Sequence, residues 1–543
     1  MTPDPPTVAG LLRARAGDGA TGLLFEDQRW SWAEVVQASA DRAAWAAGLL
    51  APDRPAHIGV LLENVPEFAF WLGGAALAGA TVVGINPTRS GPDLARDIAH
   101  TDCQVLVTES AHLPLVDRLS LDLPVLVVDA PDYRPPSASP LPPSDREPGD
   151  LFLLLFTSGT SGAPKACLCS QGRLARIGGT VAQMFALVPG DVCYQAMPLF
   201  HSNALMAGWA PALAAGAGIA LRRRFSASAF LDDVRRFGAT YANYVGKPLS
   251  YVLATPEQPD DADNPLTRVF GNEATDLDAA RFGSRFGCRV VDGYGSTEGA
   301  VSVSRTADTP PGALGRGLDG TAVLDPVTGR ECPPARFDTG GRLLNPDECV
   351  GELASRLGGR GFEGYWNNDQ ASAARVRGGI YWTGDLAYRD EAGFFYFAGR
   401  DSDRLRVDGE NLDAAPIERV LARYPSVVLA AVYAVPNEVV GDDVMAALEV
   451  EPGAGFDAEE FGAFLSRQPD LGTKSSPRYV RIASALPVTL TNKVLKRELR
   501  REAWHCDDPI WWRPRRDDRY RLLTPEDVTA LPRSVLMRPP PVL

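Results

Sequence analysis

The sequence has few of the residues that bind transition metals or build disulfide scaffolds. Its 543 residues include five histidines and eight cysteines, and the cysteines are scattered without any CxxC pair. This pattern excludes the common zinc spacings and a disulfide scaffold, and it favours a reducing compartment. Residues 1–6 lack the basic start and apolar core of a signal peptide. We therefore expect a cytoplasmic protein.

The chain also lacks a net positive charge and a strongly apolar long segment. Its formal net charge is −14 at pH 7, which argues against nucleic acid as a partner because such binding requires a basic face. Residues 68–85 carry no charge, but four glycines, several alanines and a threonine make them weakly apolar. We expect a buried helix followed by a strand there, and no transmembrane span.

Lysine is scarce as well. Five of the 54 basic residues are lysines, at positions 165, 247, 474, 493 and 496. A chain that uses arginine by default keeps lysine either by chance or where a compact ammonium is needed. Two of the five lysines fall in motifs that carry chemistry.

Apolar patterning predicts an α/β protein of several folding units. At about 150 residues per domain, the length suggests three or four units. Ser31 and Glu34 have the spacing of a capping box at the start of an Ala-rich helix. A helix over 66–78 and strands over 57–62, 81–85 and 104–107 alternate in the manner of a doubly wound sheet. Residues 131–149 contain seven prolines and are expected to form a surface connector.

Residues 151–165 combine a buried strand pattern with a loop suited to phosphate. The apolar run 151–156 leads into Thr157-Ser158-Gly159-Thr160-Ser161-Gly162-Ala163-Pro164-Lys165. Small residues let backbone N–H groups approach an anion, hydroxyls add donors, and the lysine adds positive charge. The spacing differs from a Walker A loop, and no Ser or Thr follows Lys165. A flexible linker is the alternative, but six buried-type residues before it favour phosphate binding.

This loop resembles the signature loop of the superfamily of acyl- and aryl-CoA synthetases, peptide-synthetase adenylation domains and luciferases. Members of that superfamily make acyl-adenylates from ATP and a carboxylic acid. The resemblance implies that ATP contacts a set of residues in this loop: Thr157, Ser158, Gly159, Thr160, Ser161, Gly162 and Lys165.

A second segment, residues 289–298, combines a strand with a ring, hydroxyls and a carboxylate. These residue types can stack on adenine, bind the α-phosphate and hold magnesium, although alone the segment could be an ordinary turn. It resembles the superfamily's second nucleotide motif. The resemblance assigns Glu298 to catalysis and to Mg²⁺, and it assigns nucleotide contacts to Asp292, Gly293, Tyr294, Gly295, Ser296, Thr297 and the adenine-bordering Gly271, Asn272 and Glu273.

Residues 381–400 resemble the segment that binds the ribose and ends the large domain. A carboxylate after Thr-Gly suits ribose hydroxyls, and the resemblance gives that role to Asp385 with Arg400. On its own, Asp385 would be a surface turn residue. Asp401 and Ser402 have a polar composition typical of a hinge, but Ser402 stands where relatives commonly have Asp or Lys.

Two later motifs resemble those of the superfamily's mobile C-terminal domain. Gly409, Glu410 and Asn411 fall in the loop that serves the thioester step, and Lys493 falls in the terminal catalytic-lysine motif. The alternative for Lys493 is a solvated loop lysine.

Residues 221–233 and 241–246 resemble the very-long-chain acyl-CoA synthetases, also called fatty-acid transport proteins. The resemblance places an acyl pocket at His201, Asn243, Tyr244, Val245 and Gly246, with His201 also near the reacting carboxylate. A histidine beside an apolar segment is otherwise more often structural. Lys247 departs from the acidic residue usual in that branch. Arg222, Arg223 and Arg224 form either a solvated face or a surface that attracts an anionic substrate or a membrane.

Together these motifs predict a multidomain α/β (α+β) enzyme. A large N-terminal domain, residues 1–400, would consist of doubly wound sheets plus a small barrel, and residues 401–543 would form a small mobile domain. The expected reaction converts a hydrophobic acid, ATP and CoA, with Mg²⁺, into acyl-CoA, AMP and pyrophosphate.

Three alternatives stay open at this point. The enzyme could transfer its acyl group to an acyl carrier protein or to a separate thiolation enzyme, as the altered Ser402 suggests. It could instead bind or take up fatty acids without catalysis, or act as a P-loop kinase or ATPase that releases ADP. The sequence leaves the oligomeric state open.

Overall fold

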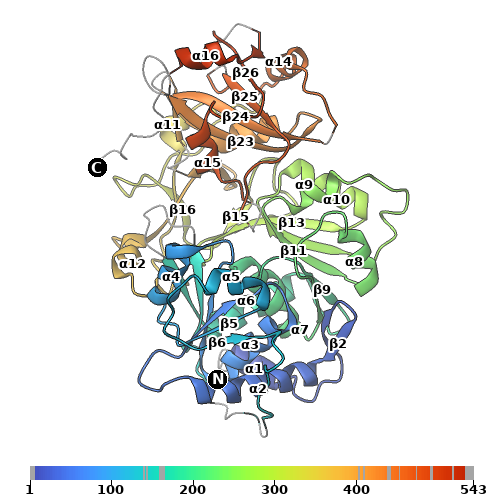
Figure 1. Ribbon diagram of the computed structural model, residues 1–543. Coiled ribbons are helices and arrows are strands. Elements are labelled where there is room, and N and C mark those ends of the chain that lie inside the picture. Colours follow the sequence, from blue (N-terminus) through green and yellow to red (C-terminus); the bar gives the residue numbers. More distant parts are fainter. Residues whose placement is uncertain are drawn as a thin grey trace.

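The computed structural model of the protein describes most of the chain and places a small domain on top of a large one (Figure 1). The described residues are 6–138, 141, 145–157, 165–400, 404–407, 410–436, 442–451, 453–472, 474–489, 493–515 and 519–531. For residues 400, 404, 406, 410, 411 and 530 the description covers the backbone alone.

A six-stranded sheet forms one layer of the large domain. Its strands run parallel except for the last pair, in the order β6-β5-β3-β4-β7-β8. The strands expected near residues 57, 81, 104 and 151 all lie in this sheet, as continuous apolar runs that are buried on both faces. Its strands are β3 (His57–Leu61), β4 (Thr81–Gly84), β5 (Val105–Thr108), β6 (Val125–Val127), β7 (Leu151–Thr157) and β8 (Lys165–Ser170).

Helices α2 (Trp32–Leu49) and α3 (Pro66–Ala78) pack together below this sheet. Ser31 and Glu34 form the expected capping box at the start of α2. The two helices approach closely because Gly73 and Gly74 have no side chains: a Cβ at Gly74 would lie 2.7 Å from the Cβ of Arg42. Helix α3 is buried nearly throughout. None of the helices in the described part of the chain is both long and apolar enough to cross a membrane.

A nine-stranded sheet forms the second layer, in the order β15-β14-β13-β12-β11-β9-β10-β1-β2. The strands from β1 to β13 along this order are parallel, and the outer pairs are antiparallel. The strands are β1 (Thr21–Phe25), β2 (Gln28–Ser31), β9 (Val192–Gln195), β10 (Gly218–Leu221), β11 (Tyr241–Val245), β12 (Arg268–Asn272), β13 (Arg289–Gly295), β14 (Ser302–Ser304) and β15 (Arg316–Gly317).

Further helices connect and cover the two large sheets, whose buried side chains merge into one core. Residues 204–215 begin as a π-helix, η2, and continue as the α-helix α7. The remaining helices of this part are α1 (Val8–Arg13), α4 (Gly91–His100), η1 (Ser110–His112), α5 (Leu113–Val116), α6 (Gln171–Met184), η2 (Ala204–Trp209), α7 (Ala210–Ala215), α8 (Phe230–Phe237), α9 (Pro248–Leu253) and α10 (Asp276–Phe286).

The predicted phosphate loop connects two antiparallel neighbours, β7 and β8. Thr157 and Lys165 lie opposite each other in their register. The chain therefore returns as a second strand, whereas a P-loop continues into a helix. Residues 158–164 lie outside the described part of the chain.

The expected small barrel corresponds to a bent five-stranded antiparallel sheet. Strand β19 pairs with β17 and with both β18 and β20, and β16 flanks β17. An isolated bridge joins Gly315 to Phe395 and so connects this sheet to the segment before β15. The elements are β16 (Thr321–Leu324), α11 (Pro346–Cys349), β17 (Gly351–Ser355), α12 (Asp369–Arg375), β18 (Val376–Arg377), β19 (Ile380–Arg389) and β20 (Phe395–Arg400).

The small domain is built on a second five-stranded sheet, in the order β23-β24-β25-β26-β27, with an apolar cluster on each face. Trp504 and Trp512 are buried in one cluster, so both tryptophans pack on this domain. The elements are β21 (Arg404–Val407), β22 (Glu410–Asp413), α13 (Ala414–Leu421), β23 (Val427–Pro436), β24 (Asp442–Val450), α14 (Ala458–Ser466), β25 (Tyr479–Ala483), α15 (Lys496–Glu502), β26 (Ile510–Trp512), β27 (Arg521–Leu522) and α16 (Pro525–Ala530).

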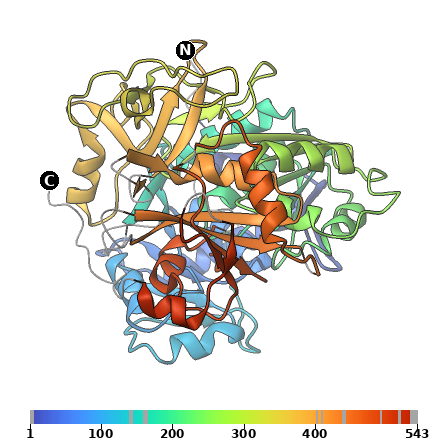
Figure 2. The ribbon, with the colours of Figure 1, turned by 90° about the horizontal axis from the view of Figure 1, so that it is seen from above.

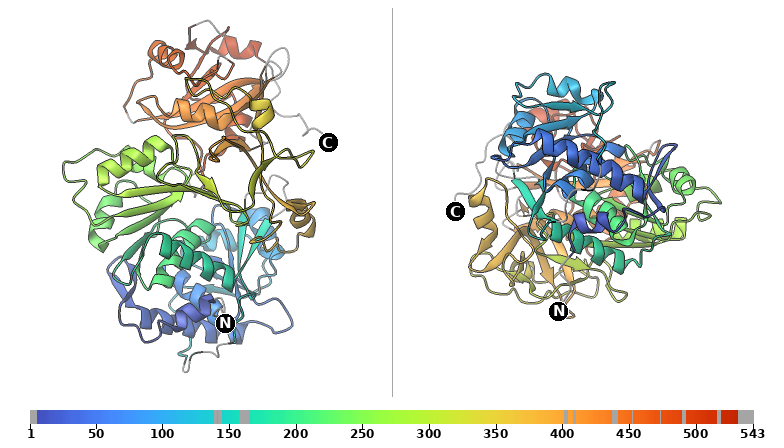
Figure 3. Two further views of the ribbon diagram at one scale, coloured as in Figure 1. Left: turned by 180° about the vertical axis from the view of Figure 1, so that it is seen from behind. Right: turned by 90° about the horizontal axis from the view of Figure 1, so that it is seen from below.

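The small domain lies over the place where the sheets of the large domain meet. From above, its orange and red elements cover the centre of the molecule, between the yellow bent sheet and the green helices (Figure 2). From behind, β23 lies next to α9 (Figure 3), and these two elements are in contact. A site at the carboxyl ends of the large domain's strands is therefore within reach of the small domain.

Candidate active site

The nucleotide motifs meet at the carboxyl ends of β11, β12 and β13. Gly271 and Asn272 end β12, Glu273 follows, and β13 carries residues 289–295. The Asn272 side chain donates to the Gly293 carbonyl at 2.6 Å, and the Gly246 N–H donates to the Asn272 carbonyl at 3.0 Å. These bonds hold the ends of the three strands together, at the edge where open α/β sheets bind ligands.

Asp292 lies behind this edge as a buried support. Its carboxylate accepts from the Tyr244 hydroxyl at 2.6 Å and from the Ala274 N–H at 2.9 Å. Burial raises the pKa of Asp292 to about 7. The carboxylate therefore connects β11, β13 and the turn after β12 in the interior of the large domain.

Tyr294 and Asp385 form one wall of the site. The Tyr294 hydroxyl donates to Asp385 Oδ2 at 2.5 Å, and the Asp385 N–H donates to Thr383 Oγ1 at 3.1 Å. Burial raises the pKa of Tyr294, with the Asp385 charge as a second cause, so this phenol stays protonated and acts as a donor. Asp385 pairs with Arg400 across the β19–β20 ladder. The adenine-side and ribose-side motifs of the sequence are thus in direct contact.

Glu298 lies in a buried polar group that includes residues without a role assigned from sequence. Tyr365 donates its hydroxyl hydrogen to Glu298 Oε1 at 2.7 Å, and the Arg375 Nε–H donates to the Tyr365 oxygen at 3.2 Å. Burial and the charge of Arg375 lower the pKa of Lys165, whereas the charge of Glu298 raises it. Lys165, Glu298 and Arg375 are therefore close enough to share one electrostatic environment.

Thr297 and Ser202 connect the second nucleotide motif to the segment that carries His201. Their hydroxyl oxygens lie 2.8 Å apart, and the Arg173 guanidinium donates to the Thr297 carbonyl. Gly295 ends β13, and Ser296 and Thr297 follow it before the buried Glu298. The Thr297 hydroxyl thus faces the segment that carries His201.

His201 is close to the small domain's lysine. Burial and the Lys493 charge lower the pKa of His201 to about 4, so the imidazole is neutral at pH 7. Two residues further on, Asn203 donates to the Tyr244 carbonyl at 2.9 Å and accepts from the Asn243 amide at 2.8 Å. Asn203 positions this wall, although no sequence pattern singles it out from its motif.

Lys493 reaches across from the small domain to the nucleotide edge. Its ammonium lies 2.6 Å from Glu273 Oε1, and the two side chains are 41% and 46% exposed. Two contacts hold the backbone at the lysine: Val488 and Val494 form a bridge, and the Thr489 N–H donates to the Lys493 carbonyl at 2.8 Å. Glu273 has φ 74°, a left-handed conformation that is uncommon for a residue other than glycine and that concentrates at functional sites.

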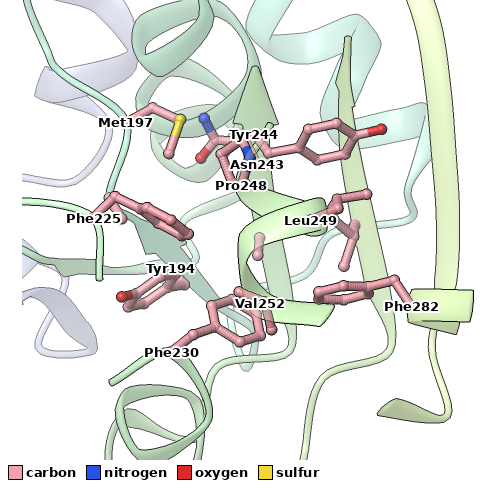
Figure 4. A pocket seen from close by; sticks show the side chains of 13 residues that line it. Tyr194, Met197, Phe225, Phe230, Asn243, Tyr244, Pro248, Leu249, Val252 and Phe282 are labelled. Carbon is pink, nitrogen blue, oxygen red and sulfur yellow. The ribbon is translucent and has the colours of Figure 1, made fainter. Parts of the chain in front are cut away.

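An apolar cavity lies against β9, β11 and β12, under α8, α9 and α10 (Figure 4). Its volume is about 20 Å³, which is room for one or two water molecules, so the side chains around it are nearly in contact. Of the predicted acyl-pocket residues, Asn243 and Tyr244 line it, whereas His201, Val245 and Gly246 do not. Its lining residues are Tyr194, Ala196, Met197, Phe225, Phe230, Ala242, Asn243, Tyr244, Pro248, Leu249, Val252, Val269 and Phe282.

The three arginines that follow β10 are paired with carboxylates. Arg222 lies 3.2 Å from Asp233. Arg223 lies 2.7 Å from Glu109, and Arg224 lies 2.7 Å from Glu63. These ion pairs neutralise the cluster locally. The geometry therefore favours a solvated, paired face over a basic surface.

Several predicted site residues lie outside what the structure describes. These are Ser158, Gly159, Thr160, Ser161 and Gly162 of the phosphate loop, Asp401 and Ser402 of the hinge, and Gly409. The side chains of Arg400, Glu410 and Asn411 are not described either, although Glu410 and Asn411 begin β22.

Burial raises the pKa of all eight cysteine thiols. A buried thiol with a raised pKa is a poor nucleophile. The cysteines therefore fit a reaction without a covalent enzyme intermediate.

Comparisons with known proteins match both domains. The family described as AMP-binding enzyme matches residues 13–366, and the AMP-binding enzyme C-terminal domain matches residues 416–493. The chain is 52% identical to the steroid-22-oyl-CoA synthetase of Rhodococcus jostii, over 97% of this chain and 96% of that protein. It is 53% identical to the medium/long-chain-fatty-acid–CoA ligase FadD17 of Mycobacterium tuberculosis, over 94% and 99%.

More distant similarities agree with these. The chain is 30% identical to human long-chain fatty acid transport protein 5, over 95% of this chain and 79% of that protein, so the expected branch is confirmed. The crystal structure of ATP-bound MatB from Rhodopseudomonas palustris has a TM-score of 0.77 at 23% identity, over 91% of this chain and 98% of that chain, which confirms the fold. The chain belongs to the AMP-binding enzyme family and is an AMP-forming acyl-CoA synthetase within it.

Proposed function

We propose that the chain activates a hydrophobic carboxylic acid in two steps that use one site and two positions of the small domain. The ion pair between Lys493 and Glu273 carries this proposal, because it brings the lysine of the C-terminal motif to the edge formed by the nucleotide motifs. This arrangement corresponds to the first step. In the second step the same face of the large domain must be open to CoA.

In the first step an oxygen of the acid's carboxylate attacks the α-phosphorus of ATP, and pyrophosphate leaves. Lys493 and the loop from Thr157 to Lys165 stabilise the negative charge that develops on the phosphate oxygens. His201 lies beside the acid and remains neutral at pH 7, so it adds no competing positive charge. Tyr294 and Asp385 hold the nucleoside, with Asn272 and Glu273 beside the adenine.

Magnesium is the metal that fits this site, and it would supply charge neutralisation on the phosphate oxygens when bound. Magnesium is usually held by one or two carboxylates together with substrate phosphates. Glu298 offers a buried carboxylate near Lys165, and Tyr365 donates to one of its oxygens and leaves the other for a ligand. The described residues contain no group of three or more candidate metal ligands, which agrees with a metal that binds together with ATP.

In the second step the small domain, residues 401–543, rotates about Asp401 and Ser402 relative to residues 1–400. The CoA thiol then attacks the acyl-adenylate carbonyl, and AMP leaves. Gly409, Glu410 and Asn411 would border the thioester-forming site after rotation. The exposed Lys493–Glu273 pair supports this motion, since breaking an exposed ion pair costs little.

The acid's apolar part would enter at the cavity against β9, β11 and β12, and the lining side chains would move apart to admit it, because the present space is about 20 Å³. Aromatic and aliphatic side chains dominate its lining, and such surface favours a hydrocarbon chain or ring system. The similar proteins named for steroid-22-oyl-CoA and for medium- and long-chain fatty acids support the same class of acid.

A second candidate differs only in the last step. Ser402 stands at the hinge where Asp or Lys is common, and an impaired rotation would leave the acyl group for an acyl carrier protein or a separate thiolation enzyme. Efficient formation of the CoA thioester by the pure chain would exclude this candidate.

The experiment that tests the proposal measures acid-dependent release of pyrophosphate from Mg-ATP. Medium-chain, long-chain and polycyclic acids would be compared, each with and without CoA. We expect AMP and acyl-CoA in equal amounts when CoA is present. Release that stops at one equivalent of bound acyl-adenylate despite CoA would support the second candidate, and ADP formation or no turnover with any acid would contradict both.

A further inference from the structure

Arg375, the last residue of α12, has a guanidinium group that is held by three hydrogen bonds. Its Nε–H donates to the Tyr365 hydroxyl oxygen at 3.2 Å. Its Nη1 group donates to the Thr383 carbonyl at 2.5 Å and to the Trp382 carbonyl at 3.3 Å. All three acceptors are neutral, since burial raises the pKa of Tyr365 and keeps its phenol protonated. The guanidinium therefore fixes the positions of neutral groups from two separate segments.

The bond to Tyr365 leads on to Glu298. The Tyr365 hydroxyl accepts from Arg375 and donates to Glu298 Oε1 at 2.7 Å, and Tyr365 and Glu298 are 3% and 6% exposed. The backbone of Tyr365 is held as well, by a bridge to Cys167 in β8 and by an N–H that donates to Ser372 Oγ at 2.9 Å. Because the hydroxyl oxygen accepts from Arg375, its hydrogen is directed at the carboxylate.

The two bonds to carbonyls lead to the turn that carries Asp385. Trp382 and Thr383 come directly before Gly384, which has φ 75°. A Cβ at Gly384 would lie 2.9 Å from Nη1 of Arg375, so the guanidinium packs against this turn. The Asp385 N–H donates to Thr383 Oγ1 at 3.1 Å. Arg375 therefore supports the backbone from which Asp385 extends.

The planar guanidinium makes these two connections depend on each other. Nε and Nη1 belong to one rigid group, so Tyr365 and Thr383 are held at a fixed separation, which the single nitrogen of a lysine cannot do. The group also lies near the phosphate loop, because burial and the charge of Arg375 lower the pKa of Lys165. One arginine thus connects the parts of the site assigned to the phosphates and to the ribose.

We propose that Arg375 is a positioning residue for ATP. Through Tyr365 it keeps the Glu298 carboxylate in position for a Mg²⁺ ion bound with ATP, and through Thr383 it supports Asp385 at the ribose. Groups that orient a metal-binding carboxylate matter because their loss typically lowers metal affinity by about 10- to 100-fold. This inference rests on the proposed function and adds a residue to the same site.

The test measures ATP binding by calorimetry without any acid, so that no turnover takes place, once with Mg²⁺ and once with EDTA. The ratio of the Kd with EDTA to the Kd with Mg²⁺ reports the contribution of the metal. Tyr365→Phe should lower this ratio by about tenfold and leave the Kd with EDTA within about twofold of wild type. A wild-type ratio in Tyr365→Phe would overturn the inference, whereas wild-type protein that binds no ATP would contradict the proposed function.

Arg375→Gln removes both connections of the guanidinium. It should lower the ratio as much as Tyr365→Phe does, and it should also raise the Kd with EDTA by about fivefold or more, because the turn of Asp385 loses its support. The double variant should have a ratio no lower than that of either single variant, since both substitutions act on one chain of hydrogen bonds. Additive losses would contradict that chain.

Arg375→Lys separates position from charge. It keeps the positive charge but cannot bond to Tyr365 and Thr383 at once, so it should behave like Arg375→Gln. Wild-type values in Arg375→Lys would overturn the positioning role. Arg356→Gln, which removes a surface arginine paired with Glu331, is the matched control and should bind ATP like wild type. Tyr365→Phe retains the buried ring and covers the case in which the Arg375 variants do not fold.

Discussion

The nucleotide edge of the large domain and the lysine turn of the small domain are held in place by different means. At the edge, Asp292, Glu298 and Asp385 are buried, and each accepts a hydrogen bond from a tyrosine on another strand or loop. Lys493 instead meets Glu273 through an ion pair that is nearly half exposed on both sides. Buried, hydrogen-bonded groups are costly to separate, whereas exposed ion pairs contribute about 1 kcal/mol or less.

The difference fits an enzyme in which the nucleotide edge serves two reactions, whereas Lys493 must move away from that edge between them. Under the proposed two-step reaction the nucleotide remains bound through both steps, so we expect its half of the site to be rigid. The same proposal requires Lys493 in the first step and requires it to make room for CoA in the second. The following variants test whether rigidity and catalysis divide between the domains in this way.

Glu298→Ala should have the largest effect on the rigid half. The variant removes the carboxylate that accepts from Tyr365 and that lies near Lys165, so the charge on the phosphates loses its organised environment. We expect kcat/KM for pyrophosphate release to fall by at least about 100-fold. Glu331→Ala, which removes a surface carboxylate paired with Arg356 and Arg389, should stay within about twofold. A small loss in Glu298→Ala would contradict the role given to this group.

Asp385→Asn should weaken nucleotide binding more than chemistry. The amide keeps an oxygen for the Tyr294 hydroxyl but loses the charge that binds ribose hydroxyls well. We expect KM for ATP to rise about tenfold with little change in kcat, the pattern of lost uniform binding. Steady-state kinetics at varied ATP would check this. A fall in kcat at unchanged KM would place Asp385 in the chemical step instead.

Asp292→Asn should change the pH dependence of stability. The pKa of Asp292 is raised from 3.8 to about 7, so between these values the native state holds a proton that the unfolded state has released. Stability therefore falls with rising pH over this window, by about 4 kcal/mol at most. The thermal midpoint of wild type relative to the variant should decline from pH 4 to pH 7 and then level off. A constant difference across the window would contradict the raised pKa.

His201 contributes the opposite slope in the same pH range. Its pKa is lowered from 6.5 to about 4, so the unfolded state binds the proton first and stability rises with pH over that window. The wild-type profile thus contains two opposing contributions. For this reason the effect of Asp292 is measured as the difference in thermal midpoint between wild type and Asp292→Asn, since both proteins contain His201.

Glu273→Gln should have the smallest effect on stability. It removes the charge that pairs with Lys493 across the domains, and because both side chains are largely exposed the loss should stay within about 1 kcal/mol. We expect an unchanged thermal midpoint within about two degrees and less dependence of the adenylation rate on salt. A large loss of stability would mean that the two domains are firmly joined in the first step. It would contradict the view that the Lys493–Glu273 pair is easily broken.

Local signals in the sequence were enough to predict much of the fold. The capping box at Ser31 and Glu34, the helix at 66–78 and the buried strands of the first large sheet follow from short-range patterns, and the structure contains them. The π-helical form of η2 did not follow, because the spacing of apolar residues indicates a helix but not its hydrogen-bond pattern. The bent sheet around β19 depends on pairings between distant segments.

The site was predictable where motifs are contiguous and not where residues meet only in three dimensions. Tyr365 and Arg375 are separated from Glu298 by more than sixty positions, and no local pattern indicates that they meet it.

The measurement that tests the division of labour most directly is the pair of half-reactions of Lys493→Ala. Adenylation is followed as acid-dependent pyrophosphate release, and thiolation as acyl-CoA formation from supplied acyl-adenylate and CoA. The account predicts a loss of at least about 100-fold in adenylation, with thiolation within a few-fold of wild type. An equal loss in both half-reactions would contradict it, because Lys493 would then be needed in both positions of the small domain.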